Sequence, residues 1–418
     1  MKLTKFGQVA LASAACLAAG LSLTACNPSS TIDYVYVTST TSSGGEVSAY
    51  HLDSVSGALS QVAGSPFSSQ GANPVAEVPS PNGQYLYVAN AGSSNIAEMV
   101  IGTNGQLSPG TTYTTPGTEP ISLAVNTAGT LLFALDYYAP GYSDSTPGPG
   151  ALVVYPINSD GSLGSPVSSG GSSYTTVQCF PGGVAVTANG SYAYVTNTNS
   201  VVVTTNPPTT TTLPATPAGC PSAGTISGFS ISSTGVLAPV AGSPFLAGTT
   251  PTGIAIDPTS RFVYATDSVQ NQLIAYEILS GGALQPLING PFTTGTYPVG
   301  VTVDPRGEYL YVTNFNSDAV SEFTINQGTG APSAGASNSF GTKEPPTCVV
   351  VDPALGRWLY TSDYATPGDI SAATLNPSTG ALGGVQDAPF PANGVPTCVA
   401  AVPHGNHATQ YDTANPGQ

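Results

Sequence analysis

Glu77 is the residue whose position most strongly suggests chemistry. It lies in the short segment 74–79 ("PVAEVP"), and six similar segments carry an aliphatic residue at the same place: Leu123, Val184, Ile254, Val301, Val349 and Val399. A buried carboxylate without a partner costs several kcal/mol. Glu77 therefore either lines a hydrated channel or acts as an acid or base with a raised pKa.

Three other charged residues lie in segments that join repeated units. Lys343 and Glu344 are neighbours in one such segment, and Glu119 occupies a similar place in another. Lys343 forms either a surface ion pair or a contact with a carboxylate or carbonyl group of a substrate. Glu77 and Lys343 are the candidate catalytic residues, and Glu119 and Glu344 are candidates for a binding face.

A polar residue ends each of six aromatic segments. An Asn or Asp that ends a strand commonly bonds nearby backbone groups, so these side chains either stabilise strand ends or form the polar floor of a ligand site. As candidates for the binding face, they are Asn90, Asp136, Asn197, Asp267, Asn314 and Asp363.

The cysteines and histidines favour disulfides over a metal. Cys179 and Cys220 flank a Thr- and Pro-rich insertion, and Cys348 and Cys398 occupy matching places in two repeats, so each pair could form a bridge in an exported protein. No Cys or His spacing typical of zinc is present. His404 and His407 belong to a polar tail, and His51 is expected at the surface, so we predict neither a metal nor a cofactor.

The N-terminal segment predicts export. Lys2 and Lys5 precede an apolar run that ends in "LTAC" at Cys26, which resembles the lipidation motif of bacterial lipoproteins. A simple signal cut after Ala25 is the alternative. We expect residues 1–25 to be a signal peptide, Cys26 to carry a lipid, 26–31 to be a tether, and the protein to be anchored to the cell envelope, at the outer membrane.

Composition limits the partners. The net charge is −16, with six Lys and Arg against 22 Asp and Glu. Such a chain repels nucleic acid and anionic lipid headgroups. We expect no nucleic-acid partner, contact with the membrane through the lipid anchor alone, and a monomer whose partner is a small molecule, a glycan or an envelope protein.

These residues must be positioned by a repeated unit. An aromatic in the middle of a β-branched segment recurs seven times: Tyr36, Tyr87, Phe133, Tyr194, Tyr264, Tyr311 and Tyr360. Around it, a typical unit has a short strand opened by Pro, a tight turn, the aromatic strand, a third strand and a Gly-x-Leu turn into an outer strand. The sixth unit departs from this pattern at its last turn, with Gly330-Ala331-Pro332. A period near 50 residues is typical of propeller blades.

The two ends of the propeller region account for the number of strands in the first unit. The first unit lacks its opening strand, and a spare strand, "PTCVAAV", begins at Pro396. Pairing the two would close the ring and remove two sheet edges. The sequence therefore predicts an all-β fold, one seven-bladed propeller of four-stranded antiparallel blades over residues 32–403, followed by a disordered tail at 404–418.

The segment from Asp304 to Asn314 ("DPRGEYLYVTN") resembles the YVTN repeat of seven-bladed propellers in the lactonase family, which includes proteins like 6-phosphogluconolactonase. The resemblance implies the propeller fold and, in members that act on lactones, His, Glu and Arg residues over the central channel. Arg261, Arg306 and Arg357 all fall in turns expected on the opposite face. The family's catalytic residues therefore cannot be placed on this chain.

Three functions remain open. An envelope-anchored binding or scaffold propeller, which uses the face at the mouth of the channel, fits the shortage of His and Arg best. A lactone hydrolase with a non-standard site is the alternative, and a purely structural envelope protein is the third. A Tyr-rich insertion from Tyr137 ("YYAPGYSDSTPGPG") suits recognition of sugars or protein chains on this face.

Overall fold

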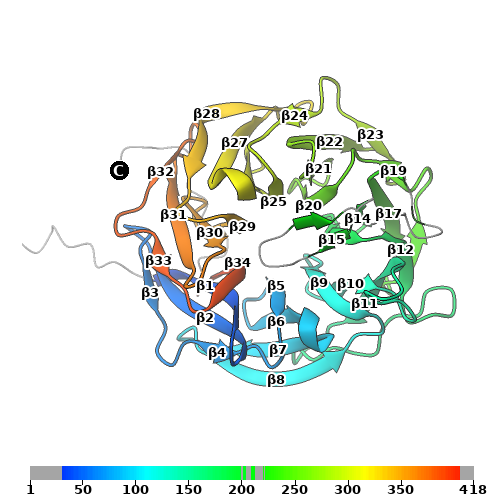
Figure 1. Cartoon of the computed structure of the whole chain (residues 1–418), viewed down its shortest axis with the longest axis horizontal. Coiled ribbons are helices and arrows are strands. Elements are labelled where there is room, and N and C mark those ends of the chain that lie inside the picture. The colour runs from blue at the N-terminus through cyan, green and yellow to red at the C-terminus, as the bar shows by residue number, and fades with distance from the viewer. Residues whose placement is uncertain (1–30, 199–200, 204–208, 212–219, 221, 405–418) are drawn as a thin grey trace, which may run out of the picture.

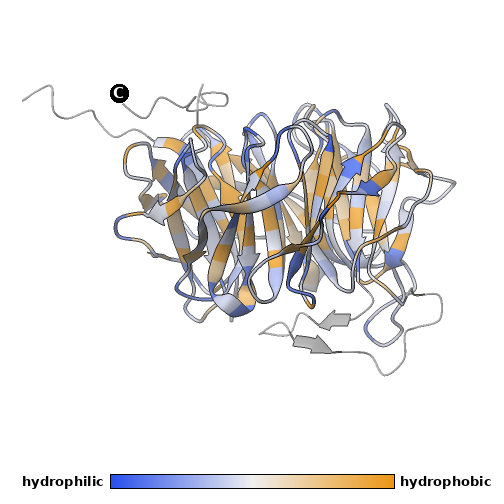
Figure 2. Cartoon of the chain, turned by 90° about the horizontal axis from the view of Figure 1, so that it is seen from above, coloured by the Kyte–Doolittle hydropathy of each residue, from blue (hydrophilic) through white to orange (hydrophobic). Residues whose placement is uncertain are grey.

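The computed structural model describes residues 31–404 except 199–200, 204–208, 212–219 and 221. Seven small sheets are arranged in a ring around a central channel (Figure 1). Seen from the side, the ring is a flat disc, with apolar residues along the strands and hydrophilic residues in the loops of both faces (Figure 2). The predicted seven-bladed propeller is confirmed.

The two ends of the described chain meet in one blade. Its inner strand is β34 (Val395–Pro403), followed outward by β1 (Thr31–Thr41), β2 (Gly44–Asp53) and β3 (Leu59–Gln61), with the short β4 (Phe67–Ser68) also pairing with β2. β1 and β34 are antiparallel, with Tyr36 opposite Ala400. The spare C-terminal strand thus completes the first blade, as the sequence predicts.

The other six blades follow the chain from the inner to the outer strand. They are β5 (Pro74–Pro79), β6 (Tyr85–Asn90), β7 (Asn95–Ile101) and β8 (Leu107–Thr114); β9 (Thr118–Val125), β10 (Leu131–Tyr138), β11 (Pro149–Pro156) and β12 (Thr175–Cys179); β13 (Pro181–Val186), β14 (Tyr192–Asn197), β17 (Thr225–Ile231) and β18 (Leu237–Pro239) with β19 (Phe245–Leu246); β20 (Pro251–Ile256), β21 (Phe262–Asp267), β22 (Gln272–Ile278) and β23 (Leu284–Pro286) with β24 (Phe292–Thr293); β25 (Pro298–Val303), β26 (Tyr309–Asn314), β27 (Ala319–Ile325) and β28 (Pro332–Gly341); and β29 (Pro346–Val351), β30 (Trp358–Asp363), β31 (Asp369–Leu375) and β32 (Leu382–Gly384) with β33 (Phe390–Pro391).

A few short elements lie outside this scheme. Two single 3-10 turns, η1 (Ala91–Ser93) and η2 (Phe315–Ser317), follow β6 and β26 at the mouth of the channel. The insertion between β14 and β17 contains a two-stranded hairpin, β15 (Val201–Val203) with β16 (Thr209–Thr211). Within the described residues, no helix is long and apolar enough to cross a membrane.

One repeated contact joins neighbouring blades. The seven recurring aromatics are fully buried, and the six tyrosines each donate a hydrogen bond of 2.7 to 3.1 Å to a glycine carbonyl in the next blade. Five of the six acceptors are the glycine of a Gly-x-Leu turn, and the sixth is Gly330 at the equivalent turn. Gly380, for example, has φ +75°, and a Cβ there would lie 2.2 Å from the Tyr309 ring. The two sequence signatures are therefore the two halves of one blade-to-blade contact.

Candidate functional site

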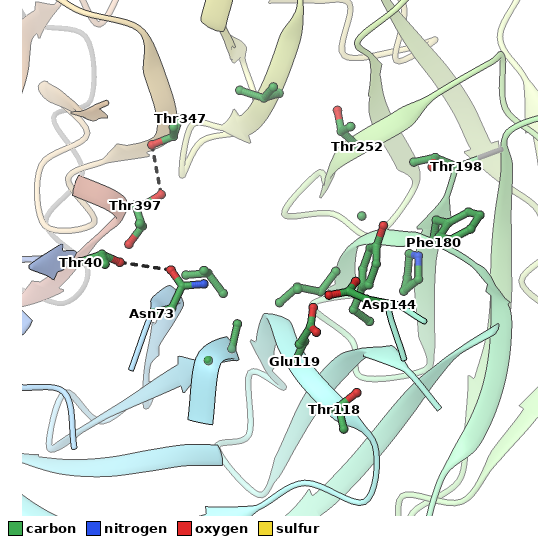
Figure 3. Close-up of a pocket in the computed structure, with 18 of the residues that line it drawn as sticks. Thr40, Asn73, Thr118, Glu119, Asp144, Phe180, Thr198, Thr252, Thr347 and Thr397 are labelled. Atoms are coloured by element: carbon green, nitrogen blue, oxygen red, sulfur yellow. Dashed lines mark hydrogen bonds between the residues drawn. The ribbon is translucent and has the colours of Figure 1, made fainter. Parts of the chain in front are cut away.

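A cavity of about 940 Å³ opens at the mouth of the channel, on the face where the inner strands begin (Figure 3). Its walls come from three sources: the starts of the inner strands, the links between blades, and the loops between second and third strands. Its size is within the range of small-molecule sites. The binding face predicted from the sequence, at the mouth of the channel, is the face that carries these loops.

One residue of each inner strand, the one that directly follows the proline near its start, lines the cavity. Three of these residues are threonines whose hydroxyls already bond the backbone; Thr347, for example, donates to the Thr397 carbonyl at 3.0 Å (Figure 3). This part of the lining therefore consists of apolar residues, one glycine and threonines that are already bonded, and it offers few free hydrogen-bonding groups. Its members are Val75, Ile121, Gly182, Thr252, Val299, Thr347 and Thr397.

Four links between blades hold a non-glycine residue in the left-handed region. Asn73, Glu119, Phe180 and Tyr297 have φ of 50°, 57°, 51° and 58°, and each immediately precedes the proline that opens an inner strand. Such a backbone costs a non-glycine residue about 1–3 kcal/mol, and it clusters at functional sites. All four residues line the cavity.

Aromatic side chains form two clusters on the cavity wall. In one, the ring centroids of Tyr297 and Phe315 are 6.3 Å apart, and those of Phe315 and Tyr364 are 5.8 Å apart. In the other, the rings of Tyr137 and Phe180 are 6.1 Å apart. The hydroxyls of Tyr137 and Tyr297 are buried without a hydrogen-bond partner. Unpaired buried polar groups are costly, so both tyrosines can offer a free hydroxyl to a ligand.

Two carboxylates provide the charge of the cavity. Glu119, at the start of β9, and Asp144, in the insertion between β10 and β11, lie together on one wall, across from Thr40 and Thr397 (Figure 3). Burial and the charge of Asp144 raise the pKa of Glu119. Asp144 accepts a hydrogen bond of 2.9 Å from the Tyr138 hydroxyl. Among the described residues that line the cavity there is no Lys, Arg or His.

Both predicted disulfides are present, and both lie beside the cavity. Cys179 and Cys220 are joined with Cα atoms 5.4 Å apart, and this bridge packs against Phe180 and Tyr137. Cys348 and Cys398 are joined with Cα atoms 4.9 Å apart and connect the inner strands β29 and β34. The first disulfide packs against the cluster of Tyr137 and Phe180, and the second links the ring-closing strand β34 to β29.

Glu77 lies outside the cavity lining. Its side chain is 8% exposed and points toward the preceding blade, where the Thr38 hydroxyl donates to its Oε2 at 2.5 Å. Burial raises its pKa to about 8. The aliphatic residues at the equivalent place in other blades also pack against the preceding blade. The structure therefore places Glu77 between blades and away from the mouth.

Lys343 and Glu344 also lie outside the lining residues. Lys343 is 59% exposed and forms an ion pair with Asp369, with 2.5 Å between Nζ and Oδ2. The Asp369 side chain is only 5% exposed. Of the predicted charged candidates, only Glu119 contributes to the cavity.

The six polar residues at the strand ends are fully buried and are not among the lining residues. Asn90 donates to the Ser69 carbonyl at 2.9 Å, and Asp267 accepts from the Thr249 amide at 2.6 Å. Burial raises the pKa of Asp136 to about 7 and that of Asp363 to about 8. Asn197 and Asn314 also donate to backbone carbonyls, at 3.0 and 3.2 Å, so these side chains stabilise the ends of the second strands.

The arginines belong to the turns between first and second strands, at the ends of the inner strands opposite to the cavity. Arg306 pairs with Asp304 at 2.8 Å, and Arg261 and Arg357 stack on Phe262 and Trp358. His51 and His404 both contact the ring of Tyr34. No group of three metal-ligating side chains occurs in the described part of the chain. Cys26 and His407 lie outside the described residues.

Sequence reasoning missed most of the cavity wall. Asp144 lies within the Tyr-rich insertion that the sequence singles out, but Phe180, Tyr297, Phe315 and Tyr364 carry no chemical motif. Two of these four precede an inner-strand proline, and the other two directly follow a polar residue that ends a second strand. Comparing these two places across the repeats could have found them.

Comparisons with known proteins agree with the architecture. The family model described as "Lactonase, 7-bladed beta-propeller" matches residues 34–175 and 183–351. A candidate 6-phosphogluconolactonase from Bacteroides uniformis superimposes with a TM-score of 0.69 at 17% identity, covering 89% of this chain and 100% of that one. Another candidate 6-phosphogluconolactonase, from Bacteroides fragilis, superimposes with a TM-score of 0.67 at 19% identity, covering 90% of this chain and 100% of that one.

The periplasmic gluconolactonase of Pseudomonas aeruginosa has a TM-score of 0.68 at 16% identity, covering 89% of this chain and 99% of that one. At these identities the structural likeness shows the fold alone. A search of curated proteins finds none that matches. The match to the family model extends over most of the propeller, and the chain therefore belongs to the lactonase family of seven-bladed β-propellers.

Proposed function

We propose that the propeller binds a sugar or an unphosphorylated sugar lactone in the cavity at the mouth of its channel. The observation that carries this proposal is the lining itself. Aromatic faces, such as those of Phe315 and Tyr364, suit the apolar face of a sugar ring, and the free hydroxyls of Tyr137 and Tyr297 suit its polar edge.

The charge of the cavity argues against a phosphorylated substrate. Phosphate groups are recognised by Arg, Lys or a helix N-terminus. The described lining offers none of these basic residues and instead presents Glu119 and Asp144. We therefore do not propose 6-phosphogluconolactone as the ligand, although some similar structures are named for activity on it. A gluconolactone without a phosphate group is not repelled by the two carboxylates.

Hydrolysis of a lactone is the second candidate, and the free Tyr137 hydroxyl beside Glu119 favours it. Burial raises the pKa of Tyr137, so its phenol stays protonated and can donate to the lactone carbonyl oxygen. Glu119 would take a proton from water while the water oxygen attacks the carbonyl carbon. As the ring C–O bond breaks, Glu119 would return that proton to the leaving alkoxide, which yields the open hydroxy acid.

We also propose that the protein is anchored to the cell envelope through Cys26. β1 starts at Thr31 and runs to the mouth, where Thr40 lines the cavity. An anchor five residues before Thr31 would attach to the face opposite to the cavity and leave the mouth open to the surroundings. Loss of membrane association in a Cys26→Ser variant, measured by fractionation, tests this anchor.

The binding proposal is tested with the soluble form that begins after Cys26. Titration calorimetry with glucono-lactone, glucose and 6-phosphogluconate compares a lactone, a neutral sugar and a phosphorylated acid. We expect binding of the first two, a loss of at least tenfold in Tyr364→Ala, and no loss in Ile288→Ala, whose exposed side chain does not line the cavity. Binding of the phosphorylated acid alone would overturn the proposal, and turnover of the lactone in a pH-stat assay separates hydrolysis from binding.

A further inference from the structure

We infer that the preferred ligand of the mouth cavity carries a positive charge, as an amino sugar does, and that its ammonium group binds between Glu119 and Asp144. The inference rests on the proposed binding function and narrows its ligand class. It is an alternative to the use of Glu119 as a base in hydrolysis, because a carboxylate paired with an ammonium group is not free to take a proton from water.

The first argument is the imbalance of charge at the mouth. The two carboxylates lie together on one wall (Figure 3), and the charge of Asp144 contributes to the raised pKa of Glu119. The four basic side chains within the described residues are engaged elsewhere: Lys343 with Asp369, and Arg261, Arg306 and Arg357 in turns at the far ends of the inner strands. Two like charges with no cation of the chain beside them favour a cationic ligand.

The second argument is that the chain holds Glu119 in place at a cost. Glu119 has φ +57°, and its backbone amide donates to the Ser94 hydroxyl at 3.2 Å. A glycine or asparagine would adopt this left-handed backbone with less strain. The glutamate at this position places a partly buried carboxylate in the cavity wall, where an ammonium group would neutralise it through charge-assisted hydrogen bonds.

The third argument is independent of the carboxylates. Tyr297 is only 8% exposed, lines the cavity, and has a hydroxyl without a partner. The unpartnered hydroxyl of Tyr137 lies near both acids, since the charges of Glu119 and Asp144 both act on its pKa. These hydroxyls can accept from an ammonium group or bond a sugar hydroxyl, and the aromatic faces attract a cation through their quadrupoles. The two acids, the aromatic faces and the unpartnered tyrosine hydroxyls together suit a sugar ring that carries an amino group.

The test compares three sugars that differ at one substituent: glucosamine, glucose and N-acetylglucosamine. The soluble propeller is titrated with each at a pH that keeps the amine protonated. We expect glucosamine to bind at least tenfold more tightly than the other two. Added salt should weaken its binding, and so should lowering the pH through the pKa of Glu119, because a protonated Glu119 no longer attracts the ammonium group.

Matched variants connect the preference to the two acids. Glu119→Gln and Asp144→Asn should each reduce the advantage of glucosamine over glucose by about tenfold. Glu344→Gln, which removes a carboxylate outside the cavity lining, should keep it. Circular dichroism of each variant checks that the fold is retained.

The outcomes separate the two proposals. If glucose binds and glucosamine binds no more tightly, the inference about charge is wrong and the binding function stands. If none of the three sugars nor the lactone binds, both are wrong. A preference for glucosamine that survives in both Glu119→Gln and Asp144→Asn would also overturn the inference, since the ammonium group would then bind elsewhere.

Discussion

The hydroxyl of Tyr360 donates a 2.7 Å hydrogen bond to the carbonyl of Gly57, a residue 303 positions earlier in the chain. Five other tyrosines make the same bond to the next blade along the chain, and Tyr360 makes it across the point where the ring closes. The ring is therefore continuous: the last blade contacts the first in the same way as in five of the other six blade pairs, the exception being the pair where Phe133 has no hydroxyl.

Removing this hydroxyl should weaken the closure of the ring. Tyr360→Phe leaves the Gly57 carbonyl buried without its partner, which costs about 1–2 kcal/mol. We expect a lower urea midpoint of unfolding for this variant. Tyr142→Phe, at an exposed tyrosine, is the control and should unfold as the wild type does. Equal stability of all three proteins would show that the tyrosine–glycine bond contributes nothing to closure.

The disulfide between Cys348 and Cys398 should protect the closing strand. It connects β29 to β34, so in the Cys348→Ser/Cys398→Ser variant β34 can separate from its neighbour more easily. We expect a loss of about 2–4 kcal/mol of stability and faster hydrogen exchange of the β34 amides. In Cys179→Ser/Cys220→Ser, which opens a bridge at the insertion, the β34 amides should exchange at the wild-type rate. Unchanged exchange in the first variant would contradict this role.

Glu77 should make stability depend on pH without affecting the ligand. Its folded pKa of about 8 lies above the ordinary value of 4.5, so the folded state retains a proton that the unfolded state loses. The contribution of Glu77 to stability is complete below pH 4.5 and is lost as the pH rises toward 8, by about 1.4 kcal/mol per pH unit.

The measurement is chemical unfolding of the wild type, Glu77→Gln and Glu77→Leu between pH 4.5 and 8. Both variants should lose less stability than the wild type over this range. Because buried Asp33 also has a raised pKa, of about 9, the difference between proteins isolates the share of Glu77. Ligand affinity should not change in Glu77→Gln, since Glu77 is not a lining residue; a change would place it in the binding machinery after all.

The backbone at Glu119 should reverse the usual order of Gly and Ala. At φ +57° the Cβ of alanine is strained and glycine is not. We therefore expect Glu119→Gly to be more stable than Glu119→Ala by about 1 kcal/mol, although both lose the carboxylate. Thermal unfolding of the two variants measures this. An alanine variant at least as stable as the glycine variant would mean that the left-handed link is not strained.

The repeat allowed the fold to be predicted from sequence, because seven similar units and a spare strand leave few arrangements. The departure at Gly330, where the Gly-x-Leu pattern is lost, proves harmless because the Tyr264 hydroxyl still finds the Gly330 carbonyl. The two disulfides could also be predicted, since Cys179 and Cys220 flank one insertion, and Cys348 and Cys398 occupy matching places in two repeats.

The residues of the site were harder to predict from the sequence than the fold, for a physical reason. Glu77 stands out from its aliphatic equivalents, but that place in the repeat faces the preceding blade and not the channel. The cavity is built instead from link residues such as Phe180 and Tyr297, whose left-handed backbone directs them to the mouth. Backbone conformation at a residue before proline is set by the packing of neighbouring blades, and propensity alone does not predict it.

The most direct test of the central claim is a crystal structure of the soluble propeller with the tightest-binding sugar or lactone of the panel. We predict the ring between the cluster of Tyr297, Phe315 and Tyr364 and the cluster of Tyr137 and Phe180, with a polar group of the ligand bonded to Glu119. A ligand bound at the arginine-bearing turns of the opposite face, or on the outer strands with the mouth empty, would contradict the account.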